Sequence, residues 1–324
     1  MIFINYKYML KTLQYNSETN SIEESNIDDL DFHKIKWINC TNPTKEELEK
    51  ISEKIAIPKE ELERCLDENE RPSITDLDNY FMIIFKSPLI QNKEVKAAAF
   101  SVLISENLIV TFSNHELDSL KQVELQSDEV KKSSLKKGTT YMAFKLIDNI
   151  VDEYFSILDS IEKDINKVED LAFHSSEKST VQKIFSLKKT LIFFQKALSA
   201  NREVLVSIEK ESSDNLDEKY IKNFRYLYND TIELIDMVAT YRDILTGTLD
   251  LYLSNVSNNL NKIIKKMTAF GSLILVPTFI TGLYGMNFKI MPEINWQHGY
   301  LFAWGLIVCS MIMLFIFFKK KDWF

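Results

Sequence analysis

The sequence predicts an α+β membrane protein with an N-terminal cytoplasmic α/β domain, long stalk helices and two C-terminal transmembrane helices. Runs rich in β-branched and aromatic residues alternate with short helical patterns up to residue 138. From Thr139 onward, apolar residues recur at steps of three and four, which is typical of long packed helices. Two long uncharged runs, 267–288 and 294–318, lie near the end of the chain. These features place a soluble part before a membrane part.

The composition indicates a largely soluble, acidic chain and argues against several functional classes. The 324 residues suffice for two or three units, and 45% of them are hydrophobic against 27% charged. A net charge of −8 argues against a nucleic-acid partner, which usually needs a basic surface. None of the seven glycines starts a phosphate-binding loop, and His115-Glu116 lacks a second histidine four residues on. We therefore expect neither an ATP-driven pump nor a zinc hydrolase, and no enzyme activity.

The cysteine pattern indicates a reducing compartment for the soluble part. Cys40, Cys65 and Cys309 form neither a disulfide framework nor a Cys-x-x-Cys site. Residues 1–7 also lack the basic start and the apolar core of a signal peptide. The N-terminal domain is therefore expected to stay in the cytoplasm.

The first 138 residues are expected to form a mixed α/β domain without an evident catalytic pocket. Asn42-Pro43 resembles an N-cap followed by a proline at the first helical position, so a helix is expected through residue 55. Pro58 opens a second short helix through residue 66. Residues 105–107 fit a hairpin turn between the last two strands. The candidate strands are 34–40, 80–85, 98–104 and 108–112.

Residues 139–266 are expected to form a coiled-coil-like stalk of long helices. A second helix, 177–210, must run antiparallel to the first, because only a short polar turn separates them. The third begins near Asp217 and meets no proline until Pro277. A helix of that length needs partners beyond its own chain, and copies of the same chain are the simplest. The apolar seam of the first helix comprises Phe144, Ile147, Val151, Tyr154, Leu158, Ile161, Ile165 and Val168.

Two membrane helices are expected at the C-terminus. Residues 267–288 carry no charged side chain, and at about 1.5 Å per residue they cover about 33 Å, enough to cross a bilayer core. Residues 300–318 are also long and apolar enough, and they follow a short external loop, 289–299. Residues 319–324 form a basic tail.

The lysines predict that both termini are cytoplasmic and that the loop lies outside. By the positive-inside rule, basic residues flank membrane spans on the cytoplasmic side. The loop holds only Lys289 and Glu293, and an even number of spans places both termini on one side. The lysines that flank the spans are Lys262, Lys265 and Lys266 before the first, and Lys319, Lys320 and Lys321 after the second.

Several motifs near the C-terminus resemble the CorA family of magnesium transporters. Tyr284-Gly285-Met286-Asn287 ends the first span, Met291-Pro292-Glu293 lies in the loop, and the chain closes with Lys319-Lys320-Lys321-Asp322-Trp323. The segment 241–254 is similar to the stalk helix of that family. The resemblance is close from about residue 140 onward and looser before it. The position of Gly-Met-Asn, after one span and before a short loop and a last span, makes the signal specific.

The resemblance implies a homopentamer in the plasma (cell inner) membrane whose first membrane helices surround a pore. Below it, the α/β domains and stalk helices would form a cytoplasmic funnel. Members of the family carry Mg²⁺, often also Co²⁺ or Ni²⁺, down the membrane potential. ZntB-type relatives, which have been linked to zinc, replace the methionine of the motif, whereas Met286 is intact here. Magnesium is therefore the expected cargo.

The resemblance assigns the selectivity filter to Gly285, Met286 and Asn287. Mg²⁺ releases its water reluctantly, and the first span offers no carboxylate to replace that water. A ring of Asn287 amides and backbone carbonyls can instead bind the hydrated ion loosely. Another role for Asn287 is to cap the C-terminus of the helix, and both roles can hold.

A helical wheel places a stripe of polar, small and apolar residues on one face of the first span. Rings of Ile264, Met267 and Leu275 could close a pore by dewetting. Alternatively, apolar members of the stripe face lipid, and Gly282 and Gly285 serve close helix packing. By resemblance, the pore-lining positions are Asn261, Ile264, Met267, Gly271, Leu275, Thr278 and Gly282.

Acidic residues suggest an entrance and a regulatory metal site. Glu293 in the loop would concentrate cations at the mouth, although an exposed loop glutamate often has no effect. Asp250 matches a family position at which Mg²⁺ bound between subunits holds the pore shut. The acidic partner comes from a neighbouring N-terminal domain in the family, and only Glu94 qualifies in the corresponding stretch, 86–94. A further stalk position, often acidic in relatives, is Tyr226 here.

Two alternatives to a magnesium channel remain open from the sequence. One is a ZntB-like zinc transporter, which would show proton-dependent zinc uptake with little magnesium flux. The other is a two-span membrane sensor or scaffold that moves no ions, in which replacing Asn287 would leave divalent uptake unchanged.

Overall fold

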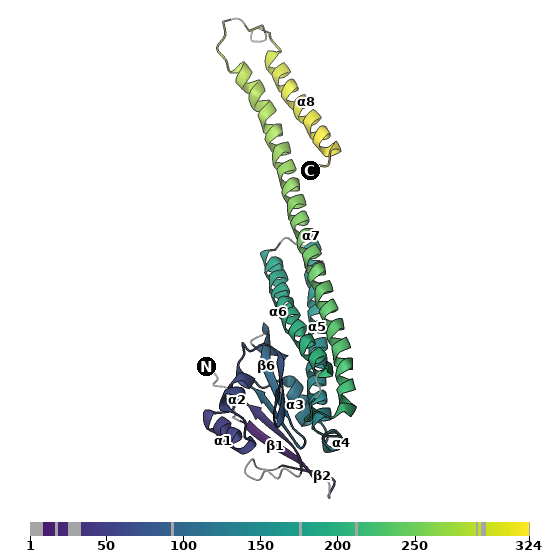
Figure 1. The fold of residues 1–324 in the computed structure, drawn as a ribbon. Coiled ribbons are helices and arrows are strands. Elements are labelled where there is room, and N and C mark those ends of the chain that lie inside the picture. Colours follow the sequence, from purple (N-terminus) through teal and green to yellow (C-terminus); the bar gives the residue numbers. More distant parts are fainter. Residues whose placement is uncertain are drawn as a thin grey trace. The chain divides into compact units, whose positions relative to one another are not determined.

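The computed structural model (Figure 1) contains a mixed α/β part, long helices and a C-terminal apolar helix, which confirms the predicted fold class. The chain divides into two compact units, one of residues 1–169 with 179–247 and the other of residues 170–178 with 248–324. The residues that the structure describes are 9–16, 19–24, 34–91, 94–174, 177–210, 213–289, 291–292 and 296–323.

The first unit is built on a seven-stranded sheet with the strand order β2-β1-β3-β7-β6-β5-β4. β3 and β7 are parallel neighbours, and the other neighbouring pairs are antiparallel. A parallel pair requires a crossover, and two short helices, α1 and α2, lie in it. The bounds are β1 Met9–Asn16, β2 Ser21–Glu24, β3 Ile35–Thr41, α1 Lys45–Ile55, α2 Lys59–Leu66, β4 Ser73–Leu77, β5 Tyr80–Gln91, β6 Glu94–Ile104 and β7 Leu108–Ser113.

The four predicted strands correspond to β3, β5, β6 and β7, which form the centre of the sheet. The predicted turn between β6 and β7 is also present, because the Ser105 amide donates to the Leu108 carbonyl at 2.8 Å. Strands β1, β2 and β4 have no counterpart among the predicted strands. β2 and β4 are the two edges of the sheet, where polar residues such as those of Ser-Ile-Glu-Glu obscure the apolar pattern of a strand.

The start of the first helix differs from the prediction. Thr44, and not Asn42, is the N-cap of α1. The Glu47 amide donates to Thr44 Oγ1 at 3.2 Å and the Thr44 amide donates to Glu47 Oε2 at 2.7 Å, so the two residues form a capping box. Asn42 has a φ of 48°, a left-handed conformation that asparagine tolerates, and its amide donates to the Ser113 carbonyl. Asn42 therefore turns the chain out of β3 before the helix begins.

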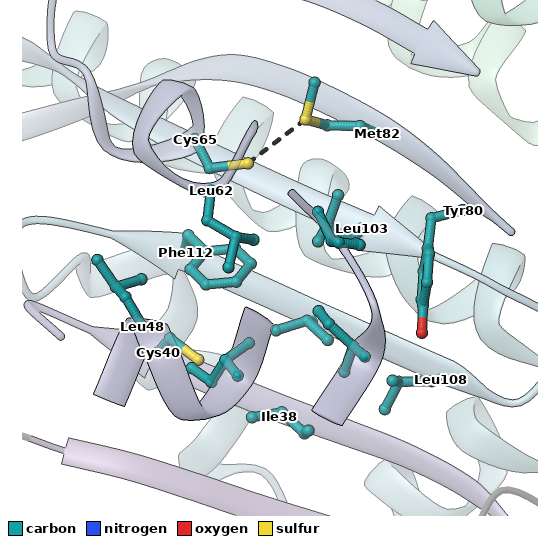
Figure 2. Packing of buried hydrophobic residues seen from close by; sticks show 14 of the residues in the cluster. Ile38, Cys40, Leu48, Leu62, Cys65, Tyr80, Met82, Leu103, Leu108 and Phe112 are labelled. Carbon is teal, nitrogen blue, oxygen red and sulfur yellow. Dashed lines mark hydrogen bonds between the residues drawn. The ribbon is translucent and has the colours of Figure 1, made fainter. Parts of the chain in front are cut away.

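One face of the sheet packs against α1 and α2 (Figure 2). Leu62 and Cys65 of α2 belong to the same buried cluster as Met82 of β5 and Phe112 of β7. The Cys65 Sγ lies 3.4 Å from the Met82 sulfur. Burial raises the pKa of Cys65 to about 12, and burial also raises the pKa of Cys40. Both thiols therefore stay protonated at neutral pH and serve as small core side chains.

The long helices of this unit meet the sheet at the outer edge of β5. β4 pairs with β5 only up to Ile84, so the next part of this edge has no strand partner. The Lys86 amide donates to Asn201 Oδ1 at 2.9 Å, and Asn201 Nδ2 donates back to the Lys86 carbonyl at 2.8 Å. Tyr154 Oη donates to the same carbonyl at 3.1 Å. A helical side chain thus replaces a strand in satisfying the backbone of β5.

The long helices agree with the predicted positions. All predicted seam residues of α5 are buried except Phe144, which is half-buried. Helix α7 contains 67 residues and continues through Pro277. Two short helices precede the long ones, α3 Asp118–Leu125 and α4 Asp128–Lys136. The long helices are α5 Thr139–His174, α6 Lys178–Lys210, α7 Glu218–Tyr284 and α8 Gly299–Lys320.

Candidate functional site

Two helices, the C-terminal part of α7 and α8, have the length and composition to cross a membrane. Only 6% of each apolar stretch is buried within the chain. A core helix of a soluble protein would be covered by its own chain, whereas these apolar side chains are left without cover. They therefore require either lipid or other copies of the chain around them.

The residues predicted to line a pore all lie on α7 and are all exposed. Met267 is 70% exposed, Leu275 is 68% exposed and Ile264 is 59% exposed. Neighbouring residues off this stripe are exposed as well, for example Ile274 at 68%. Exposure in the single chain therefore does not by itself separate a face towards a pore from a face towards lipid. The stripe residues are Asn261, Ile264, Met267, Gly271, Leu275, Thr278 and Gly282.

The glycines of this helix differ in their surroundings. A Cβ added to Gly271 or Gly282 would meet nothing within 4 Å beyond the backbone of its own helix, so among the described residues no close contact requires a glycine there. A Cβ on Gly285 would lie 3.2 Å from the Thr281 carbonyl oxygen and 3.4 Å from that of Gly282. The end of the helix therefore favours a glycine at position 285 for a local reason, which is close approach of the backbone.

Two threonine hydroxyls of α7 donate to the backbone around Pro277. Thr278 Oγ1 donates to the Ile274 carbonyl at 2.8 Å, and Thr281 Oγ1 donates to the Pro277 carbonyl at 3.0 Å. Pro277 has no amide hydrogen and therefore removes one helical hydrogen bond. Because each hydroxyl hydrogen is used by the backbone, the hydroxyl oxygens of both threonines remain available as acceptors.

The Gly-Met-Asn motif follows the last residue of α7 directly. The Gly285 amide donates to the Thr281 carbonyl at 2.9 Å, and the Met286 amide donates to the Leu283 carbonyl at 3.3 Å. Asn287 follows as an exposed, non-helical residue. Among the described non-glycine residues, positive φ occurs only at Asn20, Asn42, Ala56 and Asp322, so Asn287 is not a left-handed cap of the helix.

The connection between the two apolar helices is described only in part. Glu293, the predicted entrance residue, lies outside the described residues. Trp296 precedes α8 and is half exposed, and its ring lies 5.7 Å from that of Phe302. Tryptophans at such positions are typical of membrane surfaces, and Trp296 was not among the predicted functional residues.

The two predicted regulatory residues belong to different units of the chain. Asp250 is exposed on α7. Glu94 starts β6, where its backbone pairs with Gln91, and its side chain lies outside what the structure describes. Tyr226 is 69% exposed on α7. Within the described part of the chain, no group of three or more His, Cys, Asp or Glu residues is arranged to hold a metal.

The structure brings together carboxylates of α5 and α7 that the sequence did not single out. The pKa of Asp230 is raised, first by burial and then by the charges of Asp148, Glu233 and Asp152. The pKa of Asp152 is raised by burial and then by Asp148, while Lys145 opposes the shift. We refer to Asp148, Asp152 and Asp230 as the acidic seam. At neutral pH these carboxylates repel one another on a partly exposed flank of α5 and α7, where Asp152 is exposed and Asp148 and Asp230 are half-buried.

We expect Asp230→Asn to raise the thermal midpoint of the full-length protein in detergent at pH 7 by about 1–3 °C. The raised pKa means that the folded state prefers the protonated carboxyl, so the ionised form costs stability above that pKa. This cost disappears as the pH falls towards the usual aspartate value of about 3.9. Thermal unfolding at pH 7 and pH 4 should therefore show a gain that shrinks in acid. The exposed Asp159→Asn is the control, and an equal gain in both variants would contradict the role of the seam.

Over most of its length, this chain is similar to known magnesium transport proteins. The family model described as "CorA-like Mg2+ transporter protein" matches residues 32–320. The "Cobalt/magnesium transport protein CorA" of Methanocaldococcus jannaschii is 32% identical over 311 residues, which cover 95% of this chain and 98% of that protein. The protein of the same description from Thermotoga maritima is 32% identical over 290 residues, which cover 89% of this chain and 83% of that protein. The complete structure of the M. jannaschii CorA magnesium transporter superposes with a TM-score of 0.87 at 28% identity, with 100% of both chains covered.

Proposed function

Because the chain belongs to the CorA-like Mg²⁺ transporter family, we propose that it forms a homopentameric channel for hydrated Mg²⁺, and also for Co²⁺ or Ni²⁺. The observation that carries this proposal is the Gly285-Met286-Asn287 motif, which is exposed directly beyond the end of an apolar helix that the chain leaves almost wholly uncovered. Five such helices around an axis would turn their stripes towards that axis and together form the wall of a pore. We further propose that the two apolar helices hold the channel in the cell membrane, with both termini in the cytoplasm, because lysines flank the spans on the side of the termini.

Selectivity rests on acceptors that bind the water shell of the ion. Mg²⁺ keeps its waters and favours octahedral oxygen coordination. The stripe contains no carboxylate between Asn261 and Asn287, so it is unsuited to stripping the shell. The Asn287 amide oxygen and the Thr278 hydroxyl oxygen can accept hydrogen bonds from the bound waters. Loose binding of this kind allows an ion to enter and to leave.

Gating is assigned to the apolar members of the stripe. Rings of Ile264, Met267 and Leu275 would exclude water when they are narrow and admit the hydrated ion when they widen. No ATP is required, because a divalent ion that crosses 100 mV gains about 4.6 kcal/mol, twice about 2.3 kcal/mol per charge. Glu293 would add a local negative charge at the outer mouth.

Purified full-length protein in liposomes under an inside-negative potential tests this function. Mg²⁺ influx is expected, and it should weaken when Mg²⁺ is present inside. Zinc influx that depends on a proton gradient, with little magnesium flux, would identify a ZntB-like transporter instead. The absence of any divalent flux from a correctly assembled oligomer would favour a sensor or scaffold.

Feedback by internal Mg²⁺ is assigned to Asp250, with Glu94 of a neighbouring copy as the acidic partner. A bound ion would offset the repulsion between these carboxylates and hold the copies together in the closed state. We expect Asp250→Asn to weaken inhibition by internal Mg²⁺ about fivefold, as measured by influx at increasing internal concentrations. Asp243→Asn on the same helix is the matched control, and unchanged inhibition in the Asp250 variant would exclude this role.

A further inference from the structure

Most lysines of the membrane part lie in two clusters, one before the first apolar segment and one after the second. Residues 251–324 contain seven lysines and two carboxylates, although the whole chain has a net charge of −8. All of these lysines except Lys289 lie in two clusters, and each member is exposed. We refer to them as the lysine band, which consists of Lys262, Lys265 and Lys266 on α7 and Lys319, Lys320 and Lys321 at the end of α8.

Both clusters lie one membrane thickness from the segment that connects the helices. Lys262 to Lys266 precede the end of α7 at Tyr284 by about 27–33 Å of helix. Lys319 lies about 30 Å along α8 from Gly299. A bilayer core is about 30 Å thick, so the two clusters reach the same surface of the membrane.

The lysines of α7 point away from the proposed pore. At about 100° per residue, the mean direction of these three side chains lies about 160° from the centre of the pore stripe. They therefore cannot serve as a positive ring around the ion path when the stripe faces the axis. They lie on the outward half of the helix, at the level of the lipid headgroups.

The end of α8 adds an aromatic residue at the same level. The Trp323 amide donates to the Phe318 carbonyl at 3.1 Å and the Asp322 amide donates to the Lys319 carbonyl at 3.3 Å, with Asp322 at a φ of 53°. These bonds form a Schellman motif. The Trp323 ring stacks on Phe318 with 5.2 Å between centroids, which places an indole beside the terminal lysines. Tryptophan is enriched at this depth of a membrane.

We propose that the lysine band and Trp323 bind the headgroups of anionic phospholipids on the side of the membrane that carries the chain termini. Clusters of lysines immediately next to membrane helices are attracted to negatively charged lipid. The outward direction of the α7 lysines rests on the proposed pore, whereas the lysines and tryptophan of α8 do not depend on it. The ligand is a phospholipid within a bilayer and not free phosphate, because the band lies directly beside the apolar surface.

Quenching of Trp323 fluorescence by brominated lipids tests the proposal on the full-length protein in detergent. The contribution of this residue is isolated by subtracting the signal of Trp323→Phe. We expect brominated phosphatidylglycerol to quench at a concentration at least about tenfold lower than brominated phosphatidylcholine. Inorganic phosphate is expected not to compete. Equal quenching by both lipids, or competition by phosphate, would overturn the proposal.

Variants show whether the lysine band is responsible. Replacement of its six lysines by glutamine should remove the preference for phosphatidylglycerol, whereas replacement by arginine should retain it. Persistence of the preference in the glutamine variant contradicts the proposal. Asn287→Ala should keep the lipid preference even where it abolishes ion flux, so failure of the pore and failure of the lipid site give different results. The matched control replaces six exposed lysines elsewhere by glutamine, namely Lys45, Lys50, Lys163, Lys178, Lys196 and Lys222.

Discussion

Asn287→Ala is expected to reduce Mg²⁺ influx into proteoliposomes by at least about tenfold. The side chain is exposed immediately beyond the end of α7, where the proposed ring of amides meets the hydrated ion. Each amide that binds a water of the shell contributes about 0.5–1.5 kcal/mol, so five copies contribute about 2.5–7.5 kcal/mol. Even the lower value exceeds the 1.4 kcal/mol that corresponds to a factor of ten in binding.

The control for this experiment is another exposed asparagine of the same helix. Asn258 lies off the pore stripe, and Asn258→Ala should leave influx unchanged. Assembly of each variant is checked by gel filtration, because Asn287 makes no left-handed cap and its loss should not unfold the helix. Wild-type influx in the Asn287→Ala variant would remove the amide ring from the mechanism and would favour a protein that moves no ions.

Asn201→Leu is expected to lower the free energy of unfolding of the full-length protein by about 2–4 kcal/mol. Asn201 is 1% exposed and makes two hydrogen bonds to the backbone of Lys86. Leucine has a similar volume but leaves the Lys86 amide without its partner in a buried site. The carbonyl keeps the hydrogen bond from Tyr154, so the loss arises mainly from the unsatisfied amide.

Chemical denaturation in detergent measures this effect against graded controls. Tyr154→Phe removes one hydrogen bond from a carbonyl that keeps another, and should cost about 1 kcal/mol. Lys196→Gln, at an exposed position of α6, should change stability by less than about 0.5 kcal/mol. If Asn201→Leu unfolds at the same denaturant concentration as Lys196→Gln, the strand edge does not depend on this side chain.

Much of the fold could be predicted because it depends on local patterns. The central strands and the β6–β7 hairpin follow from runs rich in β-branched and aromatic residues, and the three long helices follow from apolar steps of three and four. The polar edge strands β2 and β4 were missed, because one side of such a strand faces solvent and its apolar period is lost. The N-cap of α1 was predicted at the wrong residue. Asn42 and Thr44 are both favourable N-cap residues, and only the turn of the chain out of β3 decides between them.

The candidate site likewise contains features that the sequence identifies and features that only the structure reveals. The apolar run, the stripe and the Gly-Met-Asn motif are contiguous or periodic along one helix, so the sequence suffices to identify them. The acidic seam could not be identified, because Asp148 and Asp230 come from helices far apart in the chain and become neighbours only through packing. Asn201 was overlooked because an asparagine within a helix carries no sign that it will meet the edge of a strand.

The sequence by itself determined that this chain has two segments able to cross a membrane and a family motif at the end of the first. A run of about 20 apolar residues is long enough to cross a bilayer core of about 30 Å, and it contains none of the charged side chains that are costly there. The tertiary structure alone decided which polar groups are satisfied by partners distant in sequence, such as the Lys86 backbone that Asn201 binds, and which carboxylates of different helices lie close enough to repel one another. These properties depend on distance and burial, and a linear order of residues specifies neither.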